Sequence, residues 1–142
     1  MADLERKAEA MWHGDLKEGK GTITAASGVL KDVPYSFVTR FENAPGTNPE
    51  ELVAAAHAAC YSMALANLLS SKGHFVHHIH TQATCYMADS SPRKITKIHL
   101  STKAKVEDID NGTFQTNADE AKRNCPISMA LAVHIELDAT LE

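Results

Sequence analysis

The residues best suited to chemistry in this chain of 142 amino acids are its three cysteines, Cys60, Cys85 and Cys125. A thiolate can act as a nucleophile or a metal ligand, and two thiols can cycle between reduced and disulfide forms. The 65 positions from Cys60 to Cys125 exclude a local CxxC loop and match no zinc-finger arrangement. Any pairing must therefore come from the tertiary fold. Each cysteine also has a simpler interpretation, as a small buried apolar residue.

The surroundings of the three cysteines differ. Cys60 lies deep inside an alanine-rich helical segment, where the field of the helix N-terminus has faded, so a thiolate there would need a nearby cation. Cys125 directly precedes Pro126. If this proline opens a short helix, Cys125 occupies the cap position, where orphan N–H groups favour a thiolate. Cys85 falls in a predicted strand and is interpreted as a core or face-filling residue.

The histidines are a second group of candidates. His74, His77, His78 and His80 fall within seven positions and could suggest a metal site. Strand alternation places His78 and His80 on one face and His77 on the other, and no carboxylate or cysteine nearby in the sequence completes a ligand set. We therefore expect surface-facing histidines and no metal. His57, three residues before Cys60, could act as a base, but a packed histidine is the favoured interpretation.

The composition predicts one soluble domain over residues 1–142. Hydrophobic residues make up 44% and charged residues 23%, and a domain of this size needs no disulfide framework. The net charge of −4 provides no basic field for nucleic acid. The longest apolar stretch, residues 52–69, is interrupted by polar side chains, and the N-terminus opens with charged residues in place of a signal core. We expect a cytoplasmic protein that does not enter a membrane.

The elements that must position these residues begin with a β-meander in the first forty residues, punctuated by turn signals at 19–21, 27–28 and 32–34. A helix is predicted to follow, with Asn48 as its cap, Pro49 at its first position and Glu51 closing a capping box. Its alanines favour a central, buried helix running to about residues 72–73.

Beyond this helix, residues 75–106 predict a long hairpin with its turn at 89–92. A helix is predicted over 116–123, a short helix from Pro126, and a closing strand over 133–137. This order favours an α+β fold, with an antiparallel β-sheet packed against the long alanine-rich helix, over an alternating βαβ fold.

Two motifs in the chain resemble those of the OsmC/Ohr family of thiol-dependent peroxidases. Residues 46–65, Gly-Thr-Asn-Pro-Glu-Glu-Leu-Val-Ala-Ala-Ala-His-Ala-Ala-Cys-Tyr-Ser-Met-Ala-Leu, are similar to the family signature, and residues 124–128, Asn-Cys-Pro-Ile-Ser, to its second cysteine motif. The resemblance extends through residues 12–15, 19–22 and 35–42, in register with the OsmC branch, and so covers nearly the whole chain.

The resemblance implies a role for each motif residue. Cys60 corresponds to the peroxidatic cysteine and Cys125 to the resolving cysteine, and Glu50 matches the family glutamate. The OsmC branch places its arginine at Arg40, whereas the Ohr branch carries it near an N-terminal turn, where this chain has residues 15–17, Asp-Leu-Lys. Tyr61, where many relatives carry phenylalanine, and the additional Cys85 depart from the family pattern.

The family also implies an intertwined homodimer, an arginine oriented by the glutamate, and no cofactor or metal. Ten helical residues separate Glu50 from Cys60, a rise of about 15 Å, so a site that combines Cys60 of one chain with Glu50 of the other is attractive. The simpler interpretation of Glu50 is a first-turn residue that complements the helix dipole.

The reaction implied is attack of the Cys60 thiolate on an organic hydroperoxide, giving an alcohol and a sulfenic acid, followed by a Cys60–Cys125 disulfide. An external dithiol, of the lipoyl type or a small dithiol, would reset the enzyme. The apolar residues around Cys60 favour alkyl or lipid hydroperoxides. The alternative is a redox-sensing or small-molecule binding module without turnover.

Overall fold

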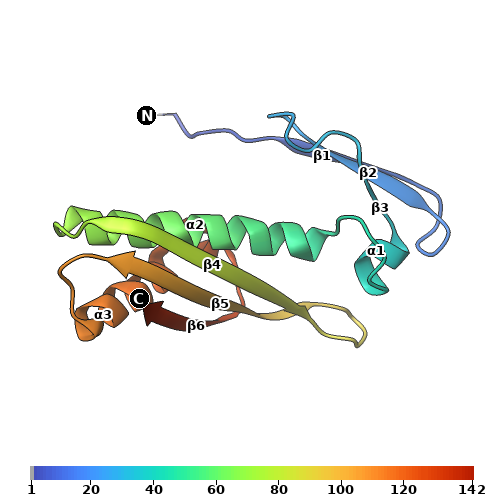
Figure 1. Cartoon of the computed structure of the whole chain (residues 1–142). Coiled ribbons are helices and arrows are strands. Elements are labelled where there is room, and N and C mark those ends of the chain that lie inside the picture. Colours follow the sequence, from blue (N-terminus) through green and yellow to red (C-terminus); the bar gives the residue numbers. More distant parts are fainter. Residues whose placement is uncertain (1) are drawn as a thin grey trace. The chain divides into compact units, whose positions relative to one another are not determined.

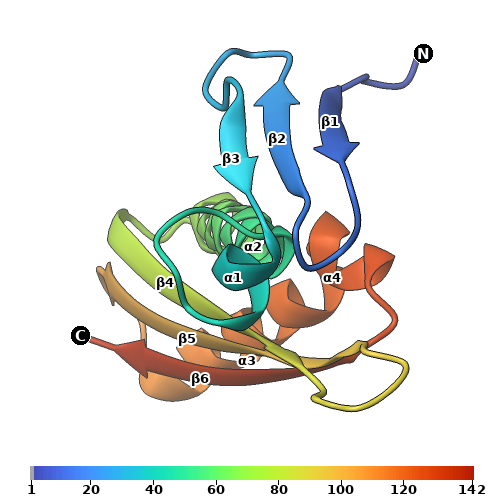
Figure 2. The ribbon, with the colours of Figure 1, turned by 90° about the vertical axis from the view of Figure 1, so that its right-hand side faces the viewer.

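The computed structural model describes residues 2–142, which form two compact units, one ending at Pro49 and the other spanning Glu50–Glu142. Figure 1 and Figure 2 together label the helices and strands along the chain. Each unit has its own β-sheet, and we describe each by itself. A single domain over residues 1–142 stays a prediction.

The first unit is the predicted β-meander followed by a short helix. Strands β1 (Ala8–His13), β2 (Lys20–Ala25) and β3 (Val33–Tyr35) pair antiparallel in the order β1-β2-β3, which confirms the prediction. Helix α1 (Phe37–Phe41) was not predicted. The Ser36 N–H donates to Thr39 Oγ1 at 2.8 Å at its N-terminus, a capping arrangement that uses threonine in place of the usual Glu or Gln.

Helix α2 (Pro49–Ser71) opens the second unit and begins at the predicted proline. It ends where Gly73 adopts φ +89°, a conformation that glycine tolerates, and where the His74 N–H donates to the Leu69 carbonyl at 3.0 Å. We expected a central, buried helix, but only one stripe of α2 is buried. Met63, on another face, is 75% exposed.

The buried stripe consists of residues spaced by four, His57, Tyr61, Leu65 and Leu69. This spacing keeps them on one side of the helix, which lies across one face of the second sheet (Figure 2). By length and composition alone α2 could also cross a membrane. A core helix passes the same test, and the buried stripe of α2 packs in the core of the second unit.

The sheet of the second unit has the strand order β4-β5-β6. Strands β4 (Val76–Met87) and β5 (Ile95–Val106) form the predicted long antiparallel hairpin. Strand β6 (His134–Leu141) is the predicted closing strand, but it pairs parallel to β5. The sheet is therefore mixed. The two helices between β5 and β6 return the chain to the end of the sheet where β5 begins, so β6 runs in the same direction as β5.

These two helices are α3 (Asn111–Asn124) and α4 (Pro126–Ala130). Helix α3 begins earlier than the predicted residue 116, because the Asp110 carboxylate accepts the Thr113 N–H at 2.8 Å and caps it there. Helix α4 begins at Pro126, as predicted.

One core holds the second unit together. Inward residues of β5 meet the buried stripe of α2 and the apolar face of α3. This core comprises Tyr61, Leu65, Leu69, Ile98, Leu100, Ala104, Val106, Phe114, Ala118, Ala121 and Cys125. The peroxidatic candidate Cys60 packs at its edge, whereas Cys125 is fully buried within it.

Candidate active site

The fold brings Cys60 of α2 and Cys125 together at the N-terminus of α4. The Cys125 thiol and the Ile127 backbone N–H both act on the pKa of Cys60, so both lie near its thiol. Cys125 is the N-cap of α4, and its Sγ accepts the Ser128 N–H at 3.3 Å. The cap position predicted for Cys125 is therefore confirmed.

The environment of Cys60 acts on its thiol in opposite directions. Burial raises the pKa of Cys60, the Ile127 N–H lowers it, and the neighbouring Cys125 raises it again. The net pKa lies above the ordinary value for a thiol. The second unit by itself therefore disfavours the thiolate, as expected from the position of Cys60 far from the start of α2.

A buried polar chain extends from Cys125 into the core. The Ser128 hydroxyl lies 3.1 Å from Cys125 Sγ, and His57 Nε2 lies 2.8 Å from the same hydroxyl. Sequence reasoning interpreted His57 as a packed histidine and did not consider Ser128. His57 is indeed fully buried, but its polar contact with α4 went unrecognised because the two residues are 71 positions apart.

The remaining thiol is separate from this pair. Cys85 of β4 packs against the core, which confirms its interpretation as a packing residue. Burial raises the pKa of Cys85, and the carboxylate of Glu50 raises it further. Glu50 therefore stands near β4 in the first turn of α2. Ten residues of straight helix separate it from Cys60, so the two cannot meet at one point within one chain.

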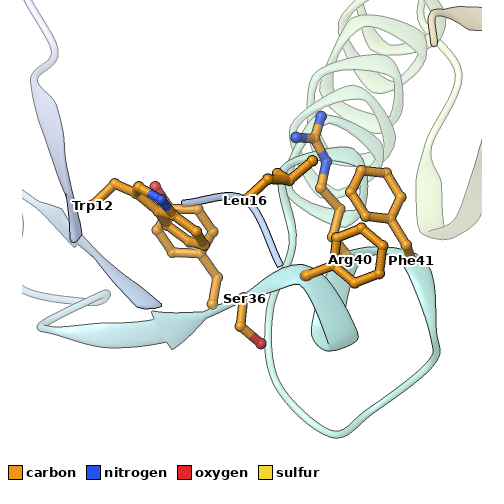
Figure 3. Close-up of a pocket in the computed structure, with 7 residues that line it drawn as sticks. Trp12, Leu16, Ser36, Arg40 and Phe41 are labelled. Atoms are coloured by element: carbon orange, nitrogen blue, oxygen red, sulfur yellow. The ribbon is translucent and has the colours of Figure 1, made fainter. Parts of the chain in front are cut away.

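Arg40 belongs to the first unit, in α1, and its approach to Cys60 stays a prediction. Its guanidinium carbon lies 5.1 Å from the centroid of the Phe41 ring, a cation–π contact. Arg40 lines a cavity of about 270 Å³ together with Trp12, Leu16, Tyr35, Ser36, Phe37 and Phe41. Figure 3 shows the guanidinium beside Leu16 and Phe41.

Aromatic packing builds the wall of this cavity. The rings of Trp12 and Tyr35 lie 5.4 Å apart across β2. Gly21 allows this approach, because a Cβ there would come within 2.6 Å of both rings. The segments that carried the family resemblance, residues 12–15, 19–22 and 35–42, thus converge on one apolar pocket with a cation at its edge.

In the histidine cluster, His77 and His78 each pair with a carboxylate, Glu107 at 3.0 Å and Glu142 at 2.9 Å. Both carboxylates are distant in the sequence. Among residues 2–142 no three His, Cys, Asp or Glu side chains are grouped as a metal would require. His77, His78 and His80 are exposed, as predicted, whereas His74 is half-buried.

Comparison with known proteins places the chain among sequences with the same motifs. The profile of the OsmC family, described as OsmC-like protein, matches residues 41–139. The chain is 45% identical over 140 residues to peroxiredoxin OsmC of Escherichia coli K12, covering 98% of both proteins. It is 28% identical over 122 residues to the organic hydroperoxide resistance protein OhrB of Bacillus subtilis, covering 86% of this chain and 89% of OhrB.

Solved structures share the fold. The crystal structure of B. subtilis OhrB matches with a TM-score of 0.70 at 24% identity, covering 96% of this chain and 98% of that chain. An OsmC-like protein from Mycoplasma pneumoniae matches with a TM-score of 0.75 at 15% identity, covering 99% of each chain. The two alignments cover nearly the whole chain and so extend over both of its units.

Proposed function

Because this chain belongs to the OsmC family, we propose that it reduces organic hydroperoxides to alcohols, with Cys60 as the peroxidatic and Cys125 as the resolving cysteine. Its relatives are named peroxiredoxin and organic hydroperoxide resistance protein, and the chain is a cysteine-based peroxidase of this kind. The observation that carries the assignment of the two residues is the approach of the Cys60 and Cys125 thiols at the start of α4.

The reaction runs in three steps. The Cys60 thiolate attacks one peroxide oxygen, the O–O bond breaks, and the departing alkoxide takes up a proton to become an alcohol. The Cys60 sulfenic acid then condenses with the Cys125 thiol to form a disulfide and water. An external dithiol, of the lipoyl type or a small dithiol, reduces the disulfide and is itself oxidised.

Arg40 is proposed to supply the cation that Cys60 needs. Burial and the Cys125 thiol raise the pKa of Cys60, so a guanidinium that cannot deprotonate would restore the thiolate and donate to the peroxide oxygens. Glu50 would accept from the same guanidinium and fix its orientation. The helical rise between Glu50 and Cys60 favours Glu50 of a partner chain for this task.

The pocket beside Arg40 supports the choice of substrate. Aromatic and aliphatic side chains line its cavity of about 270 Å³, enough for an organic tail and offering it burial away from water. Hydrogen peroxide would gain nothing from these walls. Alkyl and lipid hydroperoxides are therefore the proposed substrates.

The assembly is proposed to be a cytoplasmic homodimer. In support of the dimer, α2 presents a second face of small and apolar residues, including the exposed Met63, that stays uncovered in the single chain. Large exposed apolar side chains often mark an interface.

Multiple-turnover consumption of cumene hydroperoxide with a dithiol tests the proposal. Wild type should turn over many times per active site, whereas Cys60→Ser should be inactive and Cys125→Ser should stall after one turnover. Cys85→Ser is the matched control and should retain nearly full activity. After one equivalent of hydroperoxide, peptide mapping should find an intrachain Cys60–Cys125 disulfide.

Two results would contradict the assignment. Equal loss in Cys60→Ser and Cys85→Ser would identify the wrong nucleophile. Single-turnover oxidation of the wild type, with no further consumption in excess dithiol, would favour the sensing module.

A further inference from the structure

The buried chain of polar atoms behind Cys125 has no part in the mechanism above. Cys125 Sγ lies 3.1 Å from Ser128 Oγ, and Ser128 Oγ lies 2.8 Å from His57 Nε2. These three side chains connect α2 to the cap of α4. Cys125 and His57 are fully buried and Ser128 is 8% exposed, so water has little access to the chain of atoms.

The second ring nitrogen of His57 indicates that packing alone does not account for a histidine at this position. Nδ1 is buried and has no hydrogen-bond partner among the described residues. Buried polar atoms are almost always satisfied, and an exception has a cost that a core leucine at this position would avoid. We therefore expect the imidazole to have a role that requires only its Nε2 atom.

The chemistry of the imidazole shows what this could be. Burial lowers the pKa of His57, so the ring is neutral near pH 7 and one nitrogen can accept a proton. With the hydrogen on Nδ1, Nε2 accepts from the Ser128 hydroxyl, and the hydroxyl oxygen accepts from the Cys125 thiol. The hydrogen bonds then point in one direction, from sulfur to imidazole.

We propose that Ser128 and His57 form a proton relay that ionises Cys125 for its attack on the Cys60 sulfenic acid. The inference rests on the proposed function and deepens it, because it assigns residues to the resolving step. The Cys125 proton passes to Ser128 Oγ while the Ser128 hydroxyl proton passes to His57 Nε2. The Cys125 thiolate forms the S–S bond, and the hydroxide that leaves Cys60 becomes water as His57 returns its proton. Ser128 touches a reacting atom, and His57 acts through Ser128 as a positioning residue.

The geometry restricts the relay to the resolving step. Ser128 contacts Cys125 through both its hydroxyl and its N–H, whereas Cys60 is served by the Ile127 N–H. The other titratable group on the same stripe of α2 is Tyr61, whose hydroxyl donates to the Ala118 carbonyl at 3.1 Å. Burial raises the pKa of Tyr61, so this phenol stays protonated and does not compete for the Cys125 proton.

Rapid-mixing kinetics with one equivalent of cumene hydroperoxide separate the two oxidation steps. Sulfenic acid formation in Ser128→Ala and His57→Gln should stay within about twofold of wild type. Disulfide formation should slow at least about 100-fold, the lower end of the usual contribution of general acid–base catalysis. The longer-lived sulfenic acid should also give more Cys60 sulfinic acid at excess peroxide, measured by mass spectrometry.

The pH profile distinguishes a relay from a structural contact. In Ser128→Ala the resolving rate should rise steeply with increasing pH, because hydroxide then replaces the relay. Ser128→Thr keeps the hydroxyl and should recover most of the rate at pH 7. Glutamine at position 57 preserves a hydrogen bond to Ser128 but cannot take the proton, and His80→Gln is the control for loss of an exposed histidine.

Two outcomes would overturn the relay: wild-type resolving rates in both variants, or a slow rate that no increase in pH restores. If neither variant folds, the wild-type protein should show a slower resolving phase in D₂O with an unchanged first phase, and equal phases in both solvents would count against the relay. Failure of wild type to form any sulfenic acid would instead refute the proposed function.

Discussion

At the scale of single residues, the surroundings of Cys60 do not by themselves stabilise its thiolate. Burial and the Cys125 thiol raise its pKa, and one backbone N–H from Ile127 opposes them. A peroxidatic cysteine must ionise to attack, so the missing stabilisation has to come from a cation. Arg40 is the residue proposed to supply this cation.

Arg40→Lys should damage catalysis although it conserves charge. Lysine can lower the pKa of Cys60, but it lacks the planar fork that contacts the sulfur, the peroxide oxygens and a carboxylate together. We expect kcat/KM for cumene hydroperoxide to fall about 100-fold, as when a preorganised transition-state donor is lost. Arg93→Lys is the matched control.

A loss in Arg40→Lys no larger than in the control would remove Arg40 from the site. Thiolate absorbance at 240 nm as a function of pH gives a second measure. The apparent pKa of Cys60 should rise in Arg40→Met and stay near its wild-type value in Arg40→Lys, so that the activity loss in the lysine variant reports geometry and not ionisation.

The roles of some of these residues could be predicted from the sequence, and those of others could not. The cap role of Cys125 could be read from its position before Pro126, because a cap is a local feature. The contact of His57 with Ser128 could not, because it joins α2 to α4 across 71 positions. Arg40, Glu50 and the assignment of the two cysteines came from resemblance, since spacing alone left a packing interpretation open for each.

At the scale of elements, α2 carries the site on a buried stripe. His57, Tyr61, Leu65 and Leu69 hold one face of the helix against the core, and Cys60 lies beside this stripe. The orientation of α2 therefore decides whether Cys60 reaches the cap of α4. The packing of the buried stripe, up to two turns away, therefore helps to hold the two thiols close to each other.

Leu65→Ala should lower the free energy of unfolding by about 2–5 kcal/mol, because Leu65 is fully buried and its loss leaves a cavity in the core. Asn67→Ala, at an exposed position of the same helix, should change it by no more than about 0.5 kcal/mol. Urea titration monitored by circular dichroism measures both. Similar small changes in the two variants would mean that the stripe does not anchor α2.

Element prediction succeeded where the signal was local. Pro49, Pro126 and the turn at 89–92 fixed boundaries that the structure reproduces. The start of α3 was missed because Gly112 and Thr113 have low helix propensity, which the Asp110 cap outweighs. The direction of β6 was missed because alternation reveals which residues face the core but not which strand is the neighbour.

At the scale of the whole molecule, the proposed site draws on both units and on a second chain. The boundary between the units falls after Pro49 in the chain, so the proposed Arg40 belongs to one unit and the proposed Glu50 to the other. The helical rise from Glu50 to Cys60 favours a composite site of two subunits.

Mixing two inactive proteins should restore activity if the site is composite. In a heterodimer of Cys60→Ser and Glu50→Ala chains, one site receives an intact Cys60 and an intact Glu50, and the other receives both lesions. Subunit exchange should therefore recover peroxidase activity, up to about half of wild type for each heterodimer, in a multiple-turnover assay. Heterodimers verified by native mass spectrometry that remain inactive would exclude Glu50 from the partner's site.

The cap of α4 connects the redox state of the protein to the local stability of its backbone. In the reduced form, Cys125 Sγ accepts the Ser128 N–H and secures the first turn of α4. On forming the disulfide, the Cys125 sulfur must turn towards Cys60, so we expect oxidation to weaken the cap and to free the Ser128 N–H group. Helix α4 should then fray, and its amides should exchange with solvent faster in the oxidised protein than in the reduced one. Each turnover would thereby loosen the segment covering the disulfide at the moment when a dithiol has to reach it.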